Sequence, residues 1–451
     1  MLDNFRKLNK QPVHIAMLLV FLTAPYFYIR QSGFDFSKGS SFSLVDFFLL
    51  TSIFVVAYNF FTKRFSFDFN KHLRNMLIIG SMFTALCLLS GITAPMFAAN
   101  DHVNWRTLIS GAMQYSFIFI AFPLLVAFFI SSSNVKTAIR YIALGYIPPM
   151  IINILLAPEA AFPNLREMFF SANRAMGTYG NANSLAEVLL ITLPFYIYLI
   201  ATEKGFWQKV GYIGLIAVLD CLFLSGSFSG FIALVVIAIA NFVLLAMWKK
   251  HPLRAHMKKI LQQSLLIFFM FACSYVALSY YAPYVVGKIL ERIIPAALEP
   301  ARLKPATLKP AALEPTVLEQ TVNTRMELNY RALDKIKERS GGLFYGHGLR
   351  QTSSLPEFNF GGNGLDVHLL YLLLWAEGGF ILAATFGWYL LLLLRNCVNL
   401  AKTHPAEAVA IGTAVLSLAL FGLFLPHAYL RYFWVPLLPA FVTTKENMVT
   451  K

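Results

Sequence analysis

Long apolar segments separated by short polar connections dominate the hydrophobic pattern of the chain. Since a helix needs about 20 apolar residues to cross the core of a bilayer, the pattern predicts about twelve transmembrane helices. They are expected near residues 14–30, 43–62, 75–94, 106–131, 137–157, 183–202, 209–225, 229–248, 260–282, 367–394, 406–425 and 427–443. The predicted fold is an all-α polytopic membrane protein.

One long polar interruption divides these segments into predicted regions. They are nine spans in residues 1–282, a large loop in 283–366, three spans in 367–443 and a tail in 444–451. Within the loop, proline recurs at every fifth position from Pro295 to Pro315. Because proline has no backbone N–H, residues 293–322 are expected to form an irregular spacer. An amphipathic helix is predicted at 324–340, starting with a capping box at Thr324 and Glu327.

Positive charge is concentrated in alternate connections, from Lys7 and Lys10 at the start to Lys445 and Lys451 at the end. Cytoplasmic connections of membrane proteins carry the excess of Lys and Arg. Both termini are therefore predicted to be cytoplasmic, and the loop at 283–366 is predicted to lie outside, in the periplasm of a Gram-negative cell. The first apolar segment has no cleavage pattern after it and is interpreted as a retained helix.

The composition supports a membrane protein and argues against nucleic-acid binding, and the motifs indicate neither a metal site nor a cofactor site. The chain is 58% hydrophobic and only 13% charged, which is far from the balance of soluble proteins. Its net charge of +15 falls in short clusters between apolar segments, so it indicates topology and contact with anionic lipid rather than nucleic acid. The four cysteines form no CxxC pair. No motif predicts a metal or a cofactor.

The candidate chemistry lies in polar groups predicted at the outer face of the membrane. His368 is expected at the outer end of a span, where an imidazole can accept a proton from a hydroxyl group. Arginine offers a planar fork of donors that suits phosphate. The candidate arginines are Arg174, Arg325, Arg331, Arg350 and Arg431. Arg331 and Arg350 could instead contact lipid headgroups or solvent.

Three carboxylates are predicted inside the membrane, namely Glu187, Asp220 and Glu377. An isolated charge in hydrocarbon is costly, so such groups are paired or functional. Two interpretations are open: a proton relay of a transporter, or structural partners of arginines such as Arg431.

Four sequence stretches between residues 170 and 395 carry most of these candidates. The first runs Arg174-Ala-Met-Gly-Thr-Tyr-Gly-Asn-Ala-Asn183-Ser-Leu-Ala, and the second runs Leu224-Ser-Gly-Ser-Phe-Ser-Gly230. The third combines Thr324-Arg325 through Ala332-Leu333 with Gly346-His347-Gly348. The fourth combines Val367-His368-Leu-Leu-Tyr371-Leu with Glu377-Gly378.

Together these stretches resemble the O-antigen ligase and polymerase superfamily of bacterial envelope glycosyltransferases. The family patterns are Arg-x-x-Gly-Thr-Phe-x-x-Pro-Asn-x-x-Ala, then Ser-x-Ser-Arg, then Arg with Ala-Leu and Gly-x-Gly, then His-Asn-x-Tyr-Leu with Glu-x-Gly. Two positions depart from them. Phe228 stands where the family commonly has arginine, and Leu369 stands where asparagine usually follows the histidine.

The resemblance implies a metal-independent glycosyl transfer at the periplasmic face of the bacterial inner membrane. The donor would be a glycan linked to undecaprenyl pyrophosphate, and the acceptor would be lipid A-core or another glycan. The resemblance implies catalytic roles for His368 and Arg325. It implies binding roles for Arg174, Arg331, Arg350, His347, Asn183, Tyr371 and Arg431.

Three functions stay open on the sequence alone. A ligase is favoured over a polymerase of the same superfamily, because polymerases seldom retain the arginine loop and the His-x-x-Tyr-Leu series. A transporter of lipid-linked sugar would have two similar halves. No repeat relates residues 1–225 to residues 226–451, which disfavours it.

Overall fold

The computed structural model describes residues 54, 71–97, 103–130, 134–158, 162–171, 173–247, 257–293, 317–338, 346–352, 358–360, 363–364, 367–426, 430 and 433–442. Its helices are α4 (Lys71–Phe97), α5 (Trp105–Ser116), η2 (Phe117–Ala121), α6 (Phe122–Phe129), α7 (Val135–Leu155), α8 (Pro163–Phe169), η4 (Gly177–Tyr179), α9 (Ala182–Thr202), α10 (Phe206–Ser225), α11 (Phe228–Met247), α12 (Met257–Tyr281), α13 (Pro283–Ile293), α14 (Val317–Glu338), α15 (Leu370–Gly378), α16 (Phe380–Leu400), α17 (Pro405–Phe421) and η10 (Leu438–Phe441). Two short antiparallel pairs join β1 (Phe170–Ser171) to β2 (Arg174–Ala175) and β3 (Asn359–Phe360) to β4 (Asn363–Gly364).

The described part of the chain contains 6 helices that are long and apolar enough to cross a membrane, or up to 7 if the bent pair α12–α13 is one span. The six are α4, the continuous segment from Trp105 to Ala127, α7, α9, α10 and α16. An all-α membrane protein is thereby confirmed. The predicted segment at 14–30 lies outside the described residues, as does the one at 43–62 apart from residue 54, so the total of about twelve stays a prediction.

The single helix predicted at 367–394 is wrong, because the structure divides it into α15 and α16. Gly379 separates them with φ 85° and ψ 166°, a conformation that glycine adopts readily and other residues rarely adopt. The nine residues of α15 extend about 14 Å at 1.5 Å per residue, which is too short to cross a membrane. The spanning helix is α16.

The helix predicted at 427–443 is also wrong over residues 433–442. This segment contains turns and the four-residue 3₁₀ helix η10. Pro436 and Pro439 lack the N–H groups that a regular helix would use there. Its side chains are nevertheless buried, including Trp434 at 0% exposure.

The amphipathic helix of the large loop starts earlier than predicted. Helix α14 begins at Val317, inside the predicted spacer, and Thr324 is an interior residue rather than a cap. The proline repeat ends at Pro315, so nothing after it prevents the helix from extending toward the N-terminus. Asn363 and Gly364 of the glycine-rich segment that precedes the predicted span form β4, which pairs with β3.

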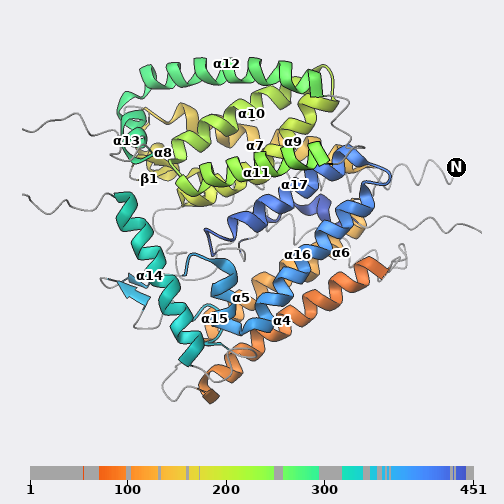
Figure 1. The fold of residues 1–451 in the computed structure, drawn as a ribbon, viewed down its shortest axis with the longest axis vertical. Helices are drawn as coiled ribbons and strands as arrows, with labels where there is room; N and C mark the ends of the chain where they lie inside the picture. The colour runs from red at the N-terminus through yellow and green to blue at the C-terminus, as the bar shows by residue number, and fades with distance from the viewer. Residues whose placement is uncertain are drawn as a thin grey trace, which may run out of the picture.

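Helix α9 occupies the centre of the molecule and packs against α7, α10, α11 and α17 (Figure 1). Almost all of its side chains are buried inside the protein. A helix that is apolar on all sides is expected to be surrounded by others. Helix α17 runs between α9 and α16 and so joins the α7–α13 group to the α4–α6 group (Figure 1).

The α4–α6 group is held to α16 by packed aromatic rings. The ring of Phe119 lies 4.2 Å from that of Tyr389 and 5.4 Å from that of Trp434, measured between centroids. Pro123 cannot donate to the Phe119 carbonyl, and the helix widens there into the π turn η2. The Tyr389 hydroxyl donates to that carbonyl at 3.1 Å. The carbonyl group that Pro123 leaves without a backbone donor thus accepts a hydrogen bond from the neighbouring helix α16.

Candidate functional site

Arg174 is held at the end of the bundle where α10 ends and α11 begins. It lies on β2, whose pairing with β1 requires a tight turn through Asn173 at φ 61°. Its Nε donates to the carbonyl of Ser225 at 2.7 Å, and its Nη2 donates to Oδ1 of Asn183 at 3.2 Å. The guanidinium therefore joins the residues before α9 to the end of α10.

Asn183 connects the same guanidinium to the turn between α10 and α11. Its Oδ1 also accepts a hydrogen bond from the hydroxyl of Ser227 at 2.9 Å. The turn is possible because Gly226 has φ +54°, a left-handed conformation that ends α10. We call residues 225–229 the serine turn.

Arg325 approaches the serine turn from the large loop. Its Nη1 donates to the hydroxyl of Ser229 at 3.2 Å. The serine turn thus receives one arginine from the segment before α9 and a second from α14. Three of the four motif stretches, far apart in the sequence, meet at this point.

The electrostatics of the serine turn favour an anion. Two guanidinium groups lie there, and neither can lose its proton in a protein. The turn also precedes the 20-residue helix α11, whose first N–H groups and dipole attract negative charge. Planar guanidinium forks, hydroxyl groups and a helix start together suit a phosphate or a diphosphate.

His368 lies immediately before Leu369, the N-cap residue of α15, and is half-buried. The preceding residue, Val367, is fully buried in a small apolar cluster with Leu328 and Ala332 of α14. Arg325 shares the face of α14 that carries Leu328 and Ala332, because the three are spaced by three and four residues. Helix α14 therefore extends from the chain beside His368 to the serine turn.

Tyr371 fixes the first turn of α15 against α17. Its hydroxyl donates to the carbonyl of Ala419 at 2.7 Å. The N–H of Leu370 donates to the carbonyl of Gly422 at 2.8 Å. The carboxyl group of Glu187 on α9 is close enough to act electrostatically on the Tyr371 hydroxyl. Glu187 follows Asn183 by one helical turn, which links this group to the serine turn along α9.

His347 and Arg350 lie at the other end of α15. The N–H groups of His347 and Gly348 donate to the carbonyls of Ala376 and Glu377 at 2.9 and 2.8 Å. The Glu377 carboxylate accepts the hydroxyl of Thr352 at 3.0 Å. These contacts join the Gly-His-Gly and Glu-Gly motifs and cap α15.

The remaining predicted site residues are placed elsewhere. The side chain of Arg350 lies beside Gly111 of α5. Arg331 is paired with Glu327 on α14. Arg431 lies outside the described residues. Within the described part of the chain, no group of three metal-ligating residues could hold a metal ion.

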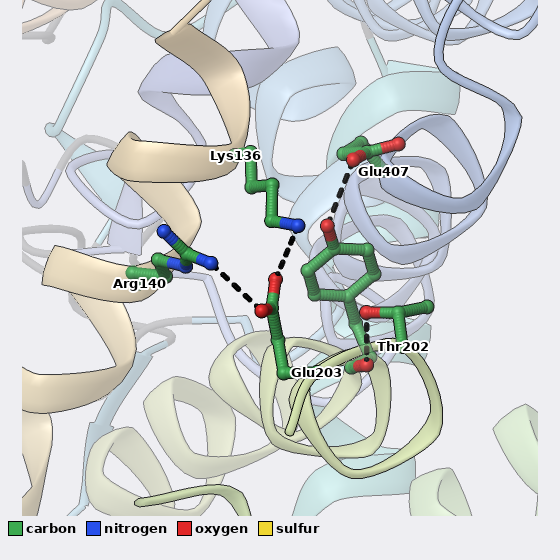
Figure 2. Close-up of polar contacts among 6 residues, drawn as sticks. Lys136, Arg140, Thr202, Glu203 and Glu407 are labelled. Atoms are coloured by element: carbon green, nitrogen blue, oxygen red, sulfur yellow. Dashed lines mark hydrogen bonds and ion pairs between the residues drawn. The ribbon is translucent and has the colours of Figure 1, made fainter. Parts of the chain in front are cut away.

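A second polar cluster lies at the C-terminal end of α9, whereas the serine turn is bound at its N-terminal end. Figure 2 shows its contacts. Lys136 and Arg140 of α7 lie 2.8 and 2.7 Å from the two carboxylate oxygens of Glu203, the C-cap residue of α9. We call these three residues the charge clamp. Nearby, the hydroxyl of Tyr198 donates to Glu407 of α17 at 2.8 Å.

The charge clamp sets the protonation of Glu203. Burial alone would raise the pKa of this carboxyl group, but the hydrogen bonds and charges of Lys136 and Arg140 outweigh burial. The pKa therefore lies below its ordinary value of 4.5.

Sequence reasoning missed the individual contacts of Ser227 and Ser229, although it singled out the segment that contains them. Lys136 and Arg140 lie in one of the positively charged connections, which the sequence pattern interprets only as topology signals. An acidic residue directly after an apolar segment, as at Glu203, is the sequence signal that could have predicted the charge clamp.

The chain matches no family model, no curated protein and no solved structure.

Proposed function

We propose that this protein is a membrane glycosyltransferase of the O-antigen ligase type, which moves a glycan from undecaprenyl pyrophosphate to lipid A-core. One observation carries the proposal. Arg174 and Arg325, from distant parts of the chain, both donate hydrogen bonds at the serine turn. This arrangement suits the diphosphate of such a donor, and Arg174 supplies the positive charge that Phe228 does not.

In the proposed reaction, an acceptor hydroxyl attacks the anomeric carbon of the donor sugar. The new glycosidic C–O bond forms as the C–O bond to the diphosphate breaks, and the diphosphate leaves with the electron pair. Arg174, Arg325 and the start of α11 stabilise the charge that develops on the diphosphate. His368 takes the proton from the acceptor hydroxyl. No metal ion is required in this scheme.

The proposed location follows from the charge pattern of the connections. The serine turn and α14 would lie at the periplasmic face of the inner membrane, and both termini would be cytoplasmic. The charge clamp would then lie at the cytoplasmic end. This placement gives the site access to a lipid-linked donor within the outer leaflet.

Binding of undecaprenyl pyrophosphate to the purified protein tests the diphosphate site. Arg325→Glu is expected to weaken binding at least about 10-fold, because it replaces an attractive charge with a repulsive one. Lys337→Glu is the matched control, since it makes the same charge reversal on an exposed part of α14. Equal affinities for the wild type and Arg325→Glu would overturn the assignment of Arg325.

A further inference from the structure

Glu187 is a buried carboxyl group that the proposed reaction does not use. It is 4% exposed, and its Oε2 accepts no hydrogen bond from any residue that the structure describes. Burying a carboxyl oxygen without a hydrogen bond costs free energy, so native proteins seldom retain such an atom without a role. The position of Glu187 indicates what that role is.

Glu187 lies between the two parts of the candidate site. On one side, Asn183 is four residues earlier on α9 and binds Arg174 and Ser227 at the serine turn. On the other side, α9 packs against α17, to which Tyr371 near the start of α15 is hydrogen-bonded. Asn183 and Tyr371 each keep part of their surface exposed, whereas Glu187 is buried.

The charge of the site limits what Glu187 can bind. Four residues of an α-helix rise about 6 Å, so Glu187 is one turn away from the place where the diphosphate would bind. A carboxyl group carries no positive charge that would attract the diphosphate itself. The part of the donor next to the diphosphate is an uncharged sugar, whose hydroxyl groups donate hydrogen bonds.

We propose that Glu187 accepts a hydrogen bond from a hydroxyl group of the sugar attached to the diphosphate, and so selects the glycan part of the donor. This inference rests on the proposed function. It differs from the roles of Arg174 and Arg325, which bind the diphosphate whether or not it carries a sugar.

The test compares two probes, undecaprenyl pyrophosphate alone and the same lipid carrying one N-acetylglucosamine. Glu187→Gln is expected to weaken binding of the sugar-bearing probe about 10-fold, since the amide replaces one of the two oxygens with an NH₂ group that only donates hydrogen bonds. Affinity for the bare lipid should not change. A Glu187→Asp protein should recover part of the preference for the sugar-bearing probe.

Asp220→Asn is the matched control. Asp220 is also a buried carboxylate, 2% exposed, but it lies on α10 and accepts the hydroxyl of Ser274 on α12. Its replacement should change neither affinity. A purely structural role of Glu187, including a pairing with Arg431, predicts that Glu187→Gln affects both probes equally or not at all. Either result would overturn the inference.

The two proposals fail in different ways. If the wild type binds neither probe, the proposed function is wrong. If it binds both probes with equal affinity in the wild type and in Glu187→Gln, the diphosphate site stands and only the role of Glu187 is lost. Glu187→Asp moves the carboxyl group back by one methylene group, so a reduced preference for the sugar-bearing probe in this variant provides the comparison if Glu187→Gln does not insert.

Discussion

Gly346 shows how closely the loop and α15 approach each other. A Cβ atom at this position would lie 2.2 Å from the carbonyl oxygen of Ala376. That distance is shorter than any normal contact, and the atoms it would meet belong to the backbone. The first glycine of the Gly-His-Gly motif is therefore required by packing.

Gly346→Ala is expected to destabilise the protein by roughly 1–3 kcal/mol, the usual cost of overpacking. Thermal unfolding of the purified protein measures this effect. Gly387→Ala is the control, because a Cβ atom there would meet nothing within 4 Å and alanine favours the helix. Equal melting temperatures for Gly346→Ala and the wild type would contradict the close approach of Gly346 to the carbonyl oxygen of Ala376.

Phe228 offers a gain-of-function prediction. It is the first residue of α11, is 42% exposed and lies within the serine turn. Phe228→Arg would add a third guanidinium and is expected to tighten binding of undecaprenyl pyrophosphate about 10-fold at low salt, with a smaller gain at high salt. Phe228→Gln controls for loss of the ring. Unchanged affinity in Phe228→Arg would argue against an anion site here.

Some residues of the site could be predicted from the sequence and others could not. Arg174 and Asn183 belong to one short stretch, and the turn at Gly226 brings the serines to them. The contact between Arg325 and Ser229 joins residues 96 positions apart. It depends on how α14 packs against α15, and the sequence pattern contains no distance information of that kind.

Among the elements, α14 carries Arg325, a residue of the proposed site, on a helix outside the membrane bundle. Its Leu328 and Ala332 are fully buried against α15, whereas Met326 on another face is 48% exposed. The apolar face therefore determines where Arg325 lies. Removing the apolar side chains of that face should therefore weaken the packing of α14 against α15.

Leu328→Ala is expected to weaken the docking of α14 by about 2–5 kcal/mol, the usual cost of removing a buried leucine side chain. The rate of limited proteolysis within residues 317–338 should rise. Met326→Ala should leave that rate unchanged, since the side chain is largely exposed. Identical rates for the two variants would contradict the packing of α14 on α15.

The charge clamp makes stability depend on pH at the opposite end of the bundle. Because the pKa of folded Glu203 lies below 4.5, its ion pairs stabilise the protein fully above that pH. The stabilisation is lost as the pH falls through the folded pKa. Glu203→Gln should lower the melting temperature at neutral pH, and the difference from the wild type should shrink well below pH 4.5. A difference that does not change with pH would contradict the clamp.

The elements themselves were predictable where apolar segments were long and uninterrupted. Helices α7, α9 and α10 agree closely with the predicted spans, although Pro148 and Pro149 lie inside α7 and Pro194 lies inside α9. The errors occur where one residue decides the backbone, as at Gly379, or where prolines end a helix, as at Pro436 and Pro439. Apolar composition shows that such a segment is buried, but it does not show its conformation.

For the whole molecule, α9 is both the structural centre and the axis of the proposed site. Its first turns carry Asn183 and Glu187, and its last residue is followed by Glu203 of the charge clamp. Helix α17 connects it to α16, and α14 contributes Arg325 from the large loop (Figure 1). The proposed reaction therefore needs the membrane bundle and the loop to be packed together.

The most direct measurement is glycan transfer by the purified protein in liposomes, without added metal. The donor is a glycan linked to undecaprenyl pyrophosphate, and lipid A-core competes with a second lipid-linked glycan as the acceptor. The account predicts transfer to lipid A-core that is abolished in Arg325→Glu and His368→Ala and retained in Lys337→Glu. Transfer to the lipid-linked glycan instead would indicate a polymerase, and full transfer by His368→Ala would contradict the account.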